Sequence, residues 1–331
     1  MASTRAIRPS WMFTVGLAGC LAIAVCWVSA NVHSRFVHHD DAVRQQQAIW
    51  ERAPFPWDGH IVELPEFRGR VLMPALMLAT RGAAGGSLGG WFLIWRVLTA
   101  FAMFVVVLRS TPGPWPWAAL GGALFSYILI LSFNHDAEQP TDFPDVAFAI
   151  GFCALTIARR FGWLVLLTVV AATNRESAAF AGVLWACVHG WPNRWRELAK
   201  GFVLCAIAYA VVLVLRHEFA VPGEVSRLQT LAVLQIPMLV REFVATPSPS
   251  GWPILLAASL APVSWLLWRQ RRDRTGAEHR LVAAGVIVVG VGLIFGLIDE
   301  LRVLLPGLAI LHYAALQSGR RLTMMFGPAA N

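Results

Sequence analysis

Long apolar stretches separated by short polar ones follow one another along the whole chain. Their lengths reach that of a helix that crosses a bilayer, roughly 20 residues, although several are shorter. The pattern predicts an all-α protein, a polytopic bundle of about ten transmembrane helices. The ten stretches are 11–32, 88–108, 116–133, 145–158, 162–174, 177–190, 201–216, 251–268, 281–298 and 303–316.

Two details of this pattern stay open. The stretches 162–174 and 177–190 are separated by only three residues, so they form either a tight helical hairpin or one kinked helix. The segment from Val71 to Thr80 is apolar but only about half as long as a span. It predicts a re-entrant or interfacial helix, followed by the glycine-rich turn Gly82–Gly90. If it were a full span, the number of transmembrane helices would be eleven.

Two polar loops are long enough to hold short interfacial helices. In loop 33–87 we expect a helix over Ala42–Trp50, with Asp40 or Asp41 as its N-cap. Loop 217–250 contains the apolar segment Leu231–Val244, which predicts a second interfacial helix. The residues of the first helix expected on the membrane surface are Val43, Ile49 and Trp50.

Basic residues in short loops orient a membrane protein, because they remain on the cytoplasmic side. With Arg5 and Arg8 inside and ten alternating helices, 15 of the 27 basic residues are cytoplasmic, beside only three of the 19 acids. Both termini are then cytoplasmic. Counting Val71–Thr80 as a span would move Arg159, Arg160 and the Arg269–Arg280 group outside, against the rule. The expected location is the inner (plasma) membrane.

Composition agrees with a single integral membrane domain over residues 1–331. The chain is 57% hydrophobic and 14% charged, against about 25% charged in soluble domains. The net charge of +8 comes from arginine clusters between apolar stretches, so it indicates membrane orientation and not nucleic-acid binding. Lys200 is the only lysine, a preference for arginine that is typical of GC-rich bacterial genomes. The five cysteines lie inside apolar stretches and are expected to pack as small hydrophobes.

The first polar motif lies just after the first apolar stretch and contains His39, Asp40 and Asp41. Adjacent carboxylates at a membrane surface can bind a divalent cation such as Mg or Mn, or one can act as a general base. The alternative is simple helix capping. Zinc is disfavoured, because neighbouring residues on a helix do not face one another.

Four further motifs lie on the same, non-cytoplasmic face of this topology. An acidic loop runs from Asp136 to Asp145, with a hydrated loop as the alternative. Residues 174–177 place Arg175 and Glu176 inside an apolar region, where charge is costly and usually functional. The alternative there is a local Arg–Glu pair at a helix turn. The other two motifs are residues 299–302, which include Glu300 and Arg302, and residues 67–74, which include Arg70.

An acidic pair after the first helix, a long first outer loop with arginines near its end, and a second acidic outer loop together resemble the GT-C superfamily of polytopic glycosyltransferases. The motifs at 174–177 and 299–302 also resemble those of bacterial membrane proteins grouped near these enzymes. The chain differs from the pattern because it is short and lacks a C-terminal soluble domain.

The resemblance implies an inverting glycosyltransferase of the cell envelope whose donor is a sugar on a polyprenyl phosphate. The catalytic base or metal ligand is then Asp40 or Asp41, and Asp136 or Asp145 assists with a metal or the acceptor. Arg175, Arg302 and Arg70 are the expected phosphate-binding residues. The supporting residues are His39, Glu176 and Glu300.

Two other classes of function remain open. A transporter or flippase of a lipid-linked or anionic substrate needs charge near the membrane midplane, for which Arg96 and the pair at 175–176 are the candidates. A non-catalytic partner in an envelope complex is the third class.

Overall fold

The computed structural model describes residues 10–33, 39–53, 56–57, 60–61, 69–112, 114–132, 141–190, 194–220, 252–272, 274–295 and 304–317. Helices make up most of this part of the chain, which confirms the all-α class. Two short strands, β1 (Pro56–Trp57) and β2 (His60–Ile61), pair antiparallel within the first loop.

All ten apolar stretches form helices. The α-helices are α1 (Trp11–His33), α2 (His39–Glu51), α3 (Leu72–Ala84), α4 (Leu88–Ser110), α5 (Trp115–Ser132), α6 (Asp142–Ile157), α7 (Phe161–Ala172), α8 (Phe180–Trp185), α9 (Trp195–Glu218), α11 (Trp252–Arg269), α12 (Gly276–Phe295) and α13 (Leu305–Gln317). The stretch 177–190 is divided among a 3-10 helix η2 (Glu176–Ala179), α8 and a π-helix η3 (Ala186–Gly190).

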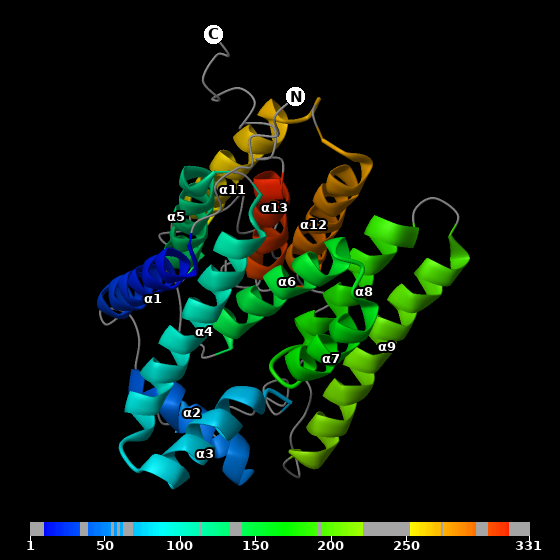
Figure 1. The fold of residues 1–331 in the computed structure, drawn as a ribbon. Coiled ribbons are helices and arrows are strands. Elements are labelled where there is room, and N and C mark those ends of the chain that lie inside the picture. Colours follow the sequence, from blue (N-terminus) through cyan, green and yellow to red (C-terminus); the bar gives the residue numbers. More distant parts are fainter. Residues whose placement is uncertain are drawn as a thin grey trace, which may run out of the picture.

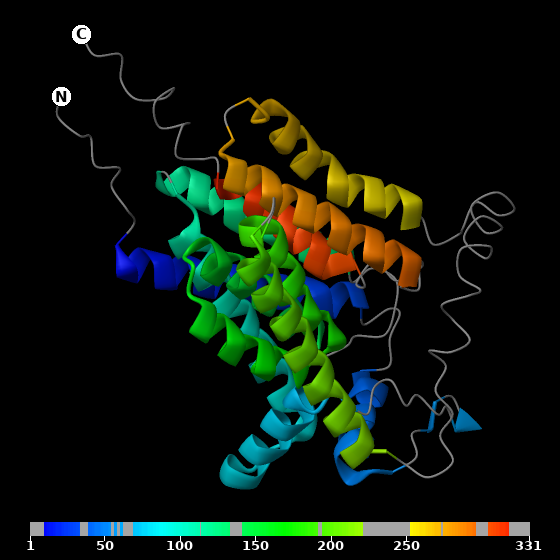
Figure 2. The same ribbon diagram turned by 90° about the vertical axis from the view of Figure 1, so that its right-hand side faces the viewer.

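The helices form a bundle with a smaller layer at one end. Helices α2 and α3 lie below the bundle beside the start of α4, and α11, α12 and α13 form the part farthest from them (Figure 1). Figure 2 shows the same separation from the side. One continuous apolar core extends through α1, α4 to α9, α12 and α13, and a smaller one joins α3 to α4.

Helices that follow one another in the bundle run in alternating directions. The guanidinium of Arg109, at the end of α4, lies 5.2 Å from the ring centre of Trp11, at the start of α1. The Nε of Arg280, at the start of α12, donates to the carbonyl of Val188 in η3 at 2.9 Å. We call the end that holds these contacts the basic end. We call the opposite end the network end, after a group of paired polar side chains that is described below. The alternation agrees with the order expected from the apolar stretches.

The stretches 162–174 and 177–190 form a hairpin and not one kinked helix. Phe161 begins α7 and Trp185 ends α8, and their ring centres are 5.1 Å apart. The chain therefore reverses between the two helices, at residues 173–176. Helix α9 packs against both arms of the hairpin.

The structure supports membrane insertion without establishing ten spans. Among the described residues, three helices are long and apolar enough to cross a bilayer: Trp11–Ser29, Leu88–Ser110 and Trp195–Glu218. Large apolar side chains also face outward, and Trp163 is 64% exposed and Phe202 75% exposed. A soluble monomer rarely exposes extensive apolar surface, so these side chains favour contact with lipid. The protein is an all-α membrane protein by these criteria, while the number of spans remains a prediction.

The first loop differs in detail from the expectation. Helix α2 begins at His39, so Asp40 and Asp41 belong to its first turn and are not its N-cap. The expected surface residues Val43 and Ile49 instead pack inward, because α2 lies on α3 and α4. Trp50 remains 43% exposed.

The predicted interfacial helix at Val71–Thr80 is α3, which is somewhat longer than expected. The glycine-rich turn after it also forms, and Gly85 and Gly86 adopt positive φ angles of 72° and 86° that favour glycine. The Ser87 hydroxyl then accepts from the backbone N–H of Gly90 at 3.1 Å and caps α4. The second interfacial helix, Leu231–Val244, lies outside the described residues.

Candidate functional site

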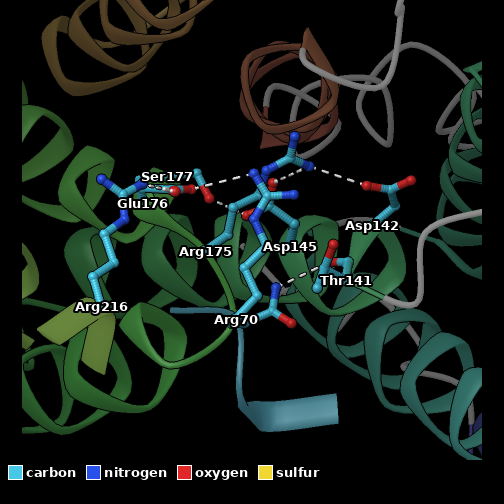
Figure 3. A network of polar contacts seen from close by, with 9 residues as sticks. Arg70, Thr141, Asp142, Asp145, Arg175, Glu176, Ser177 and Arg216 are labelled. Atoms are coloured by element: carbon cyan, nitrogen blue, oxygen red, sulfur yellow. Dashed lines mark hydrogen bonds and ion pairs between the residues drawn. The ribbon is translucent and has the colours of Figure 1, made fainter. Parts of the chain in front are cut away.

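Four separate segments bring charged side chains together at the network end (Figure 3). They are the end of the first loop, the start of α6, the turn between α7 and α8, and the end of α9. We call these residues the polar network: Arg70, Thr141, Asp142, Asp145, Asn174, Arg175, Glu176, Ser177 and Arg216.

The start of α6 supplies two buried carboxylates. Asp142 and Asp145 both lie in the first turn of the helix, and both are buried. Carboxylates are favoured in the first turn because the unpaired backbone N–H groups there carry partial positive charge. The carbonyl of Thr141 accepts from Asp145 N at 3.0 Å and from the side-chain amide of Asn174 at 2.9 Å. The second contact attaches the α7–α8 turn to the start of α6.

The geometry of this turn separates the side chains of Arg175 and Glu176. Helix α7 ends with two backbone N–H groups, those of Asn174 and Arg175, donating to the carbonyl of Ala171. Arg175 is extended, with φ −165° and ψ 157°, and η2 begins at the next residue. Arg175 consequently pairs with acids on α6, while Glu176 pairs with an arginine on α9. These partners replace the local Arg–Glu pair that was the alternative from the sequence.

Arg175 forms the inner part of the polar network with the two acids of α6. Its Nη1 lies 3.0 Å from Asp142 Oδ1 and 3.6 Å from Asp145 Oδ2. The side chains are 12%, 0% and 6% exposed, respectively. Ser177 donates its hydroxyl to the other oxygen of Asp145. A buried charge without a partner is strongly destabilising, so each of these groups requires the others.

Glu176 forms the outer part with two arginines from distant segments. Its Oε1 accepts a hydrogen bond from Arg216 Nη2, and its Oε2 lies 3.6 Å from Arg70 Nη2. The side chain is 37% exposed and that of Arg216 is 23% exposed. Burial disfavours the charged form, but Arg70 and Arg216, with a further contribution from Arg175, outweigh it and lower the pKa of Glu176 below its ordinary value. The carboxylate is therefore ionised at neutral pH.

The first loop ends directly on helix α9. A Cβ on Gly69 would lie only 3.2 Å from Cγ of Arg216, so the absence of a side chain allows this close approach. The backbone N–H of Leu72 donates to the carbonyl of Thr173 at 2.9 Å. These two contacts position Arg70 between α9 and the α7–α8 turn.

A further arginine, Arg96 of α4, lies close to the polar network on the side of α1. Its Nη2 donates to the Ser29 hydroxyl at 2.6 Å, and its guanidinium lies 4.5 Å from the ring centre of Phe143. Arg96 is 3% exposed. Because Phe143 belongs to the first turn of α6, Arg96 lies at the level of that turn and not midway along the bundle.

The structure brings four of the residues selected from the sequence into one network: Arg70, Asp145, Arg175 and Glu176. His39, Asp40 and Asp41 belong to the first turn of α2, where the structure describes only the backbone course, and α2 packs against α3 and α4. The other three selected residues, Asp136, Glu300 and Arg302, lie outside the described residues. The functional roles assigned to all ten remain predictions.

Sequence reasoning did not select Asp142, Arg216 or Ser177 as site residues, and it considered Arg96 only as the midplane charge of a transporter. Asp142 and Ser177 lie within selected motifs, and their distinguishing property is burial, which has no marker in the sequence. Arg216 ends the stretch 201–216, and a charge at the end of an apolar helix normally indicates an interface. The only available signal was that the predicted topology places it on the same face as Arg175.

No cluster of three or more His, Cys, Asp and Glu side chains that would suit a metal ion occurs in the part of the chain that the structure describes. In the inner part of the network, Arg175 holds the position that a cation would need between the two acids. What the network can offer is arginine for an anionic group, with ionised carboxylates next to it.

Comparisons with family models, with curated proteins and with solved structures yield no match to this chain.

Proposed function

We propose that the protein is a membrane glycosyltransferase that uses a polyprenyl-phosphate-linked sugar at the non-cytoplasmic face of the inner membrane. The observation that supports this proposal best is the polar network. It gathers Arg70, Arg175 and Arg216 at the same end of the bundle as the helices of the first loop. A phosphate leaving group needs such arginines, and an acceptor hydroxyl needs a nearby carboxylate.

In this proposal the first-loop acids perform the chemistry. Asp41 or Asp40 deprotonates or orients the acceptor hydroxyl, directly or with a divalent cation. Arginines of the network, together with Arg302, bind the phosphate that leaves as the glycosidic bond forms. Helix α2 lies beside the end of α9, because Trp50 contacts Phe219 with ring centres 6.0 Å apart. Asp40 and Asp41 are at the other end of α2.

A transporter of an anionic substrate is the second candidate, and the buried Arg96 is the observation in its favour. Its neighbours weaken that reading. Ser29 is near the end of α1 and Phe143 is in the first turn of α6, so Arg96 belongs to the level of the polar network. A midplane site needs charge halfway along the bundle, and Arg96 lies nearer to one end.

The experiment is transfer of sugar from a polyprenyl-phosphate donor in reconstituted vesicles. Asp41→Asn keeps the size and most hydrogen bonding of the side chain but removes the charge. Loss of a general base typically lowers the rate by about 10²–10⁴-fold, while insertion and folding should be unchanged. Asp40→Asn should be tested alone and in combination, because either carboxylate can be the base.

Glu51→Gln is the matched control, since this exposed residue is at the other end of α2. It should retain full transfer activity. Full activity in the Asp40→Asn, Asp41→Asn double variant would overturn the proposal and leave the two carboxylates as residues that stabilise α2. Transport of the lipid-linked sugar by that variant would then favour the second candidate.

A further inference from the structure

The two parts of the polar network differ in formal charge and in exposure. The inner part has one arginine, Arg175, and two acids, and it is almost completely buried. The outer part has two arginines, Arg70 and Arg216, and one acid, Glu176. The three arginines and three acids of the described network balance, but the outer part alone has one more arginine than acids. A ligand can approach this part at Arg216 and Glu176, whose side chains are 23% and 37% exposed, while Arg70 is 11% exposed.

Glu176 divides its carboxylate between the two arginines. One oxygen accepts from Arg216 and the other faces Arg70, so the carboxylate bridges the first loop and α9. The distance from Glu176 Oε2 to Arg70 Nη2 is 3.6 Å, so this contact is an ion pair but is too long for a hydrogen bond. A phosphate group has more acceptor oxygens than a carboxylate and is well matched to the planar guanidinium fork.

We infer that Arg70 and Arg216 form a binding site for a phosphate group, and that Glu176 is an internal anion that occupies this site until a phosphate displaces it. This inference rests on the proposed function for the identity of the ligand, a lipid-linked phosphate. It adds Arg216 as a binding residue and gives Glu176 a role as a competitor of the substrate.

The mobility that displacement requires is present at Glu176 but not at the inner acids. The Glu176 side chain is on a short 3-10 turn and is more than one-third exposed, so it can rotate into solvent. Arg70, whose side chain is 11% exposed, then needs the incoming phosphate as its counter-ion. Asp142 and Asp145 cannot rotate into solvent, because they are almost fully buried against Arg175. The inner part thus holds the turn in place while the outer part exchanges its anion.

An internal anion competes with the phosphate for the site. The apparent affinity for the phosphate is therefore the intrinsic affinity multiplied by the fraction of molecules in which the site is open. Removing the carboxylate should therefore strengthen phosphate binding, although the variant loses an ionic interaction in the free protein. Glu176→Gln keeps the shape of the side chain and removes the negative charge. Arg216→Gln removes one of the two guanidiniums.

The test is equilibrium binding of three probes to the purified full-length protein in detergent: a polyprenyl phosphate, the corresponding polyprenol and inorganic phosphate. Glu176→Gln should bind the polyprenyl phosphate about tenfold more tightly than the wild type, as expected if the site is open in about one molecule in ten. Arg216→Gln should bind it at least tenfold more weakly. Binding of the polyprenol should change in neither variant, and binding of inorganic phosphate with the same pattern would identify a free phosphate as a sufficient ligand.

Unchanged or weaker polyprenyl-phosphate binding by Glu176→Gln would overturn the inference. If that variant does not fold, Glu176→Asp is the alternative, because it shortens the reach of the carboxylate. It should give a smaller increase in affinity, and the absence of any increase would also overturn the inference. The outcome is separate from that of the proposed function. Tighter phosphate binding without any sugar transfer would retain the inference and reject the glycosyltransferase, and transfer with unchanged binding would do the reverse.

Discussion

Arg216 and Glu176 form an ion pair between residues that are 40 positions apart in the sequence. The arginine is in the last turn of α9 and the glutamate begins η2 in the α7–α8 turn. Their contact requires that α9 returns to the network end beside this turn. The packing of α8 against α9 therefore helps to determine whether the outer part of the polar network can form.

That packing depends on two glycines. A Cβ on Gly182 of α8 would lie 2.3 Å from the carbonyl of Gly201 in α9, and a Cβ on Gly201 would lie 2.8 Å from the carbonyl of Gly182. Small residues at such a crossing allow helix backbones to approach closely. Gly182→Ala should lower the free energy of unfolding by about 1–3 kcal/mol, the usual cost of overpacking.

Denaturation in mixed micelles, followed by circular dichroism, measures this change. Gly162→Ala in α7 is the matched control, because a Cβ there meets no atom within 4 Å. Alanine at that exposed helical position should leave stability unchanged or raise it by about 0.4–1 kcal/mol. Equal losses in both variants would show that α8 and α9 are not in backbone contact.

The inner part of the network makes a second prediction about stability. Arg175→Gln removes the guanidinium that lies 3.0 Å from Asp142 and 3.6 Å from Asp145, and breaking a buried ion pair in this way typically costs about 3–5 kcal/mol. The same denaturation experiment measures the loss. Adding Asp142→Asn to this variant should recover part of the stability, because it removes one of the two buried negative charges that Arg175 neutralised.

Arg160→Gln provides the control for the loss of an arginine as such. Arg160 is exposed at the basic end, and surface substitutions of this kind usually change stability by less than about 0.5 kcal/mol. A comparable effect of Arg160→Gln and Arg175→Gln would contradict the assignment of Arg175 to a buried ion pair.

A third prediction concerns pH and the outer part of the network. Arg70 and Arg216, with a smaller contribution from Arg175, lower the pKa of Glu176, which lies in a turn outside the predicted spans. A carboxylate with a lowered pKa in the folded state stabilises the protein fully above its unfolded pKa of about 4.3. This stabilisation is lost as pH falls through the lower, folded pKa.

The melting temperature of the wild type and of Glu176→Gln should be compared between pH 7 and pH 3.5 in the same detergent. The wild type should be the more stable protein at neutral pH, and the difference should decrease below about pH 4.3. The other carboxylates titrate in both proteins and cancel in the comparison. A difference that is constant over the whole range would mean that Glu176 does not gain its charge-dependent stability from these arginines.

The sequence predicted the helices well because apolar length is a local property. All ten apolar stretches are helical, the short Val71–Thr80 segment is α3, and the described parts of the charged motifs at 67–74, 136–145 and 174–177 meet at one end of the bundle. Alternation of direction was enough to predict that common end. The number of spans did not follow equally well, since α6, α7, α8 and α13 are shorter than about 20 residues.

The partners within the network could not be predicted, because they depend on direction and depth at single residues. Arg175 and Glu176 are adjacent in sequence, yet the extended conformation at Arg175 directs them to different helices. Arg216 had no motif of its own, and its role depends on the contact between Gly69 and α9. The sequence predicted Val43 and Ile49 on the membrane surface, but they pack inward. The amphipathic pattern shows that a helix has an apolar face, but not whether that face covers lipid or other helices.

The last prediction tests orientation in the membrane. His217 at the network end and Thr275 at the basic end are both exposed, and the bundle separates them. The excess of arginine at the basic end predicts that this end is cytoplasmic. Single cysteines at the two positions, on a background without the five native cysteines, should therefore react differently with a membrane-impermeant thiol reagent.

His217→Cys should react in intact cells, and Thr275→Cys only after the membrane is permeabilised. Phe55→Cys and Thr230→Cys, chosen from the predicted outer loops, should behave like His217→Cys. Reaction of Thr275→Cys from outside would reverse the orientation and place the polar network in the cytoplasm, where a polyprenyl-phosphate donor used at the outer face could not reach it.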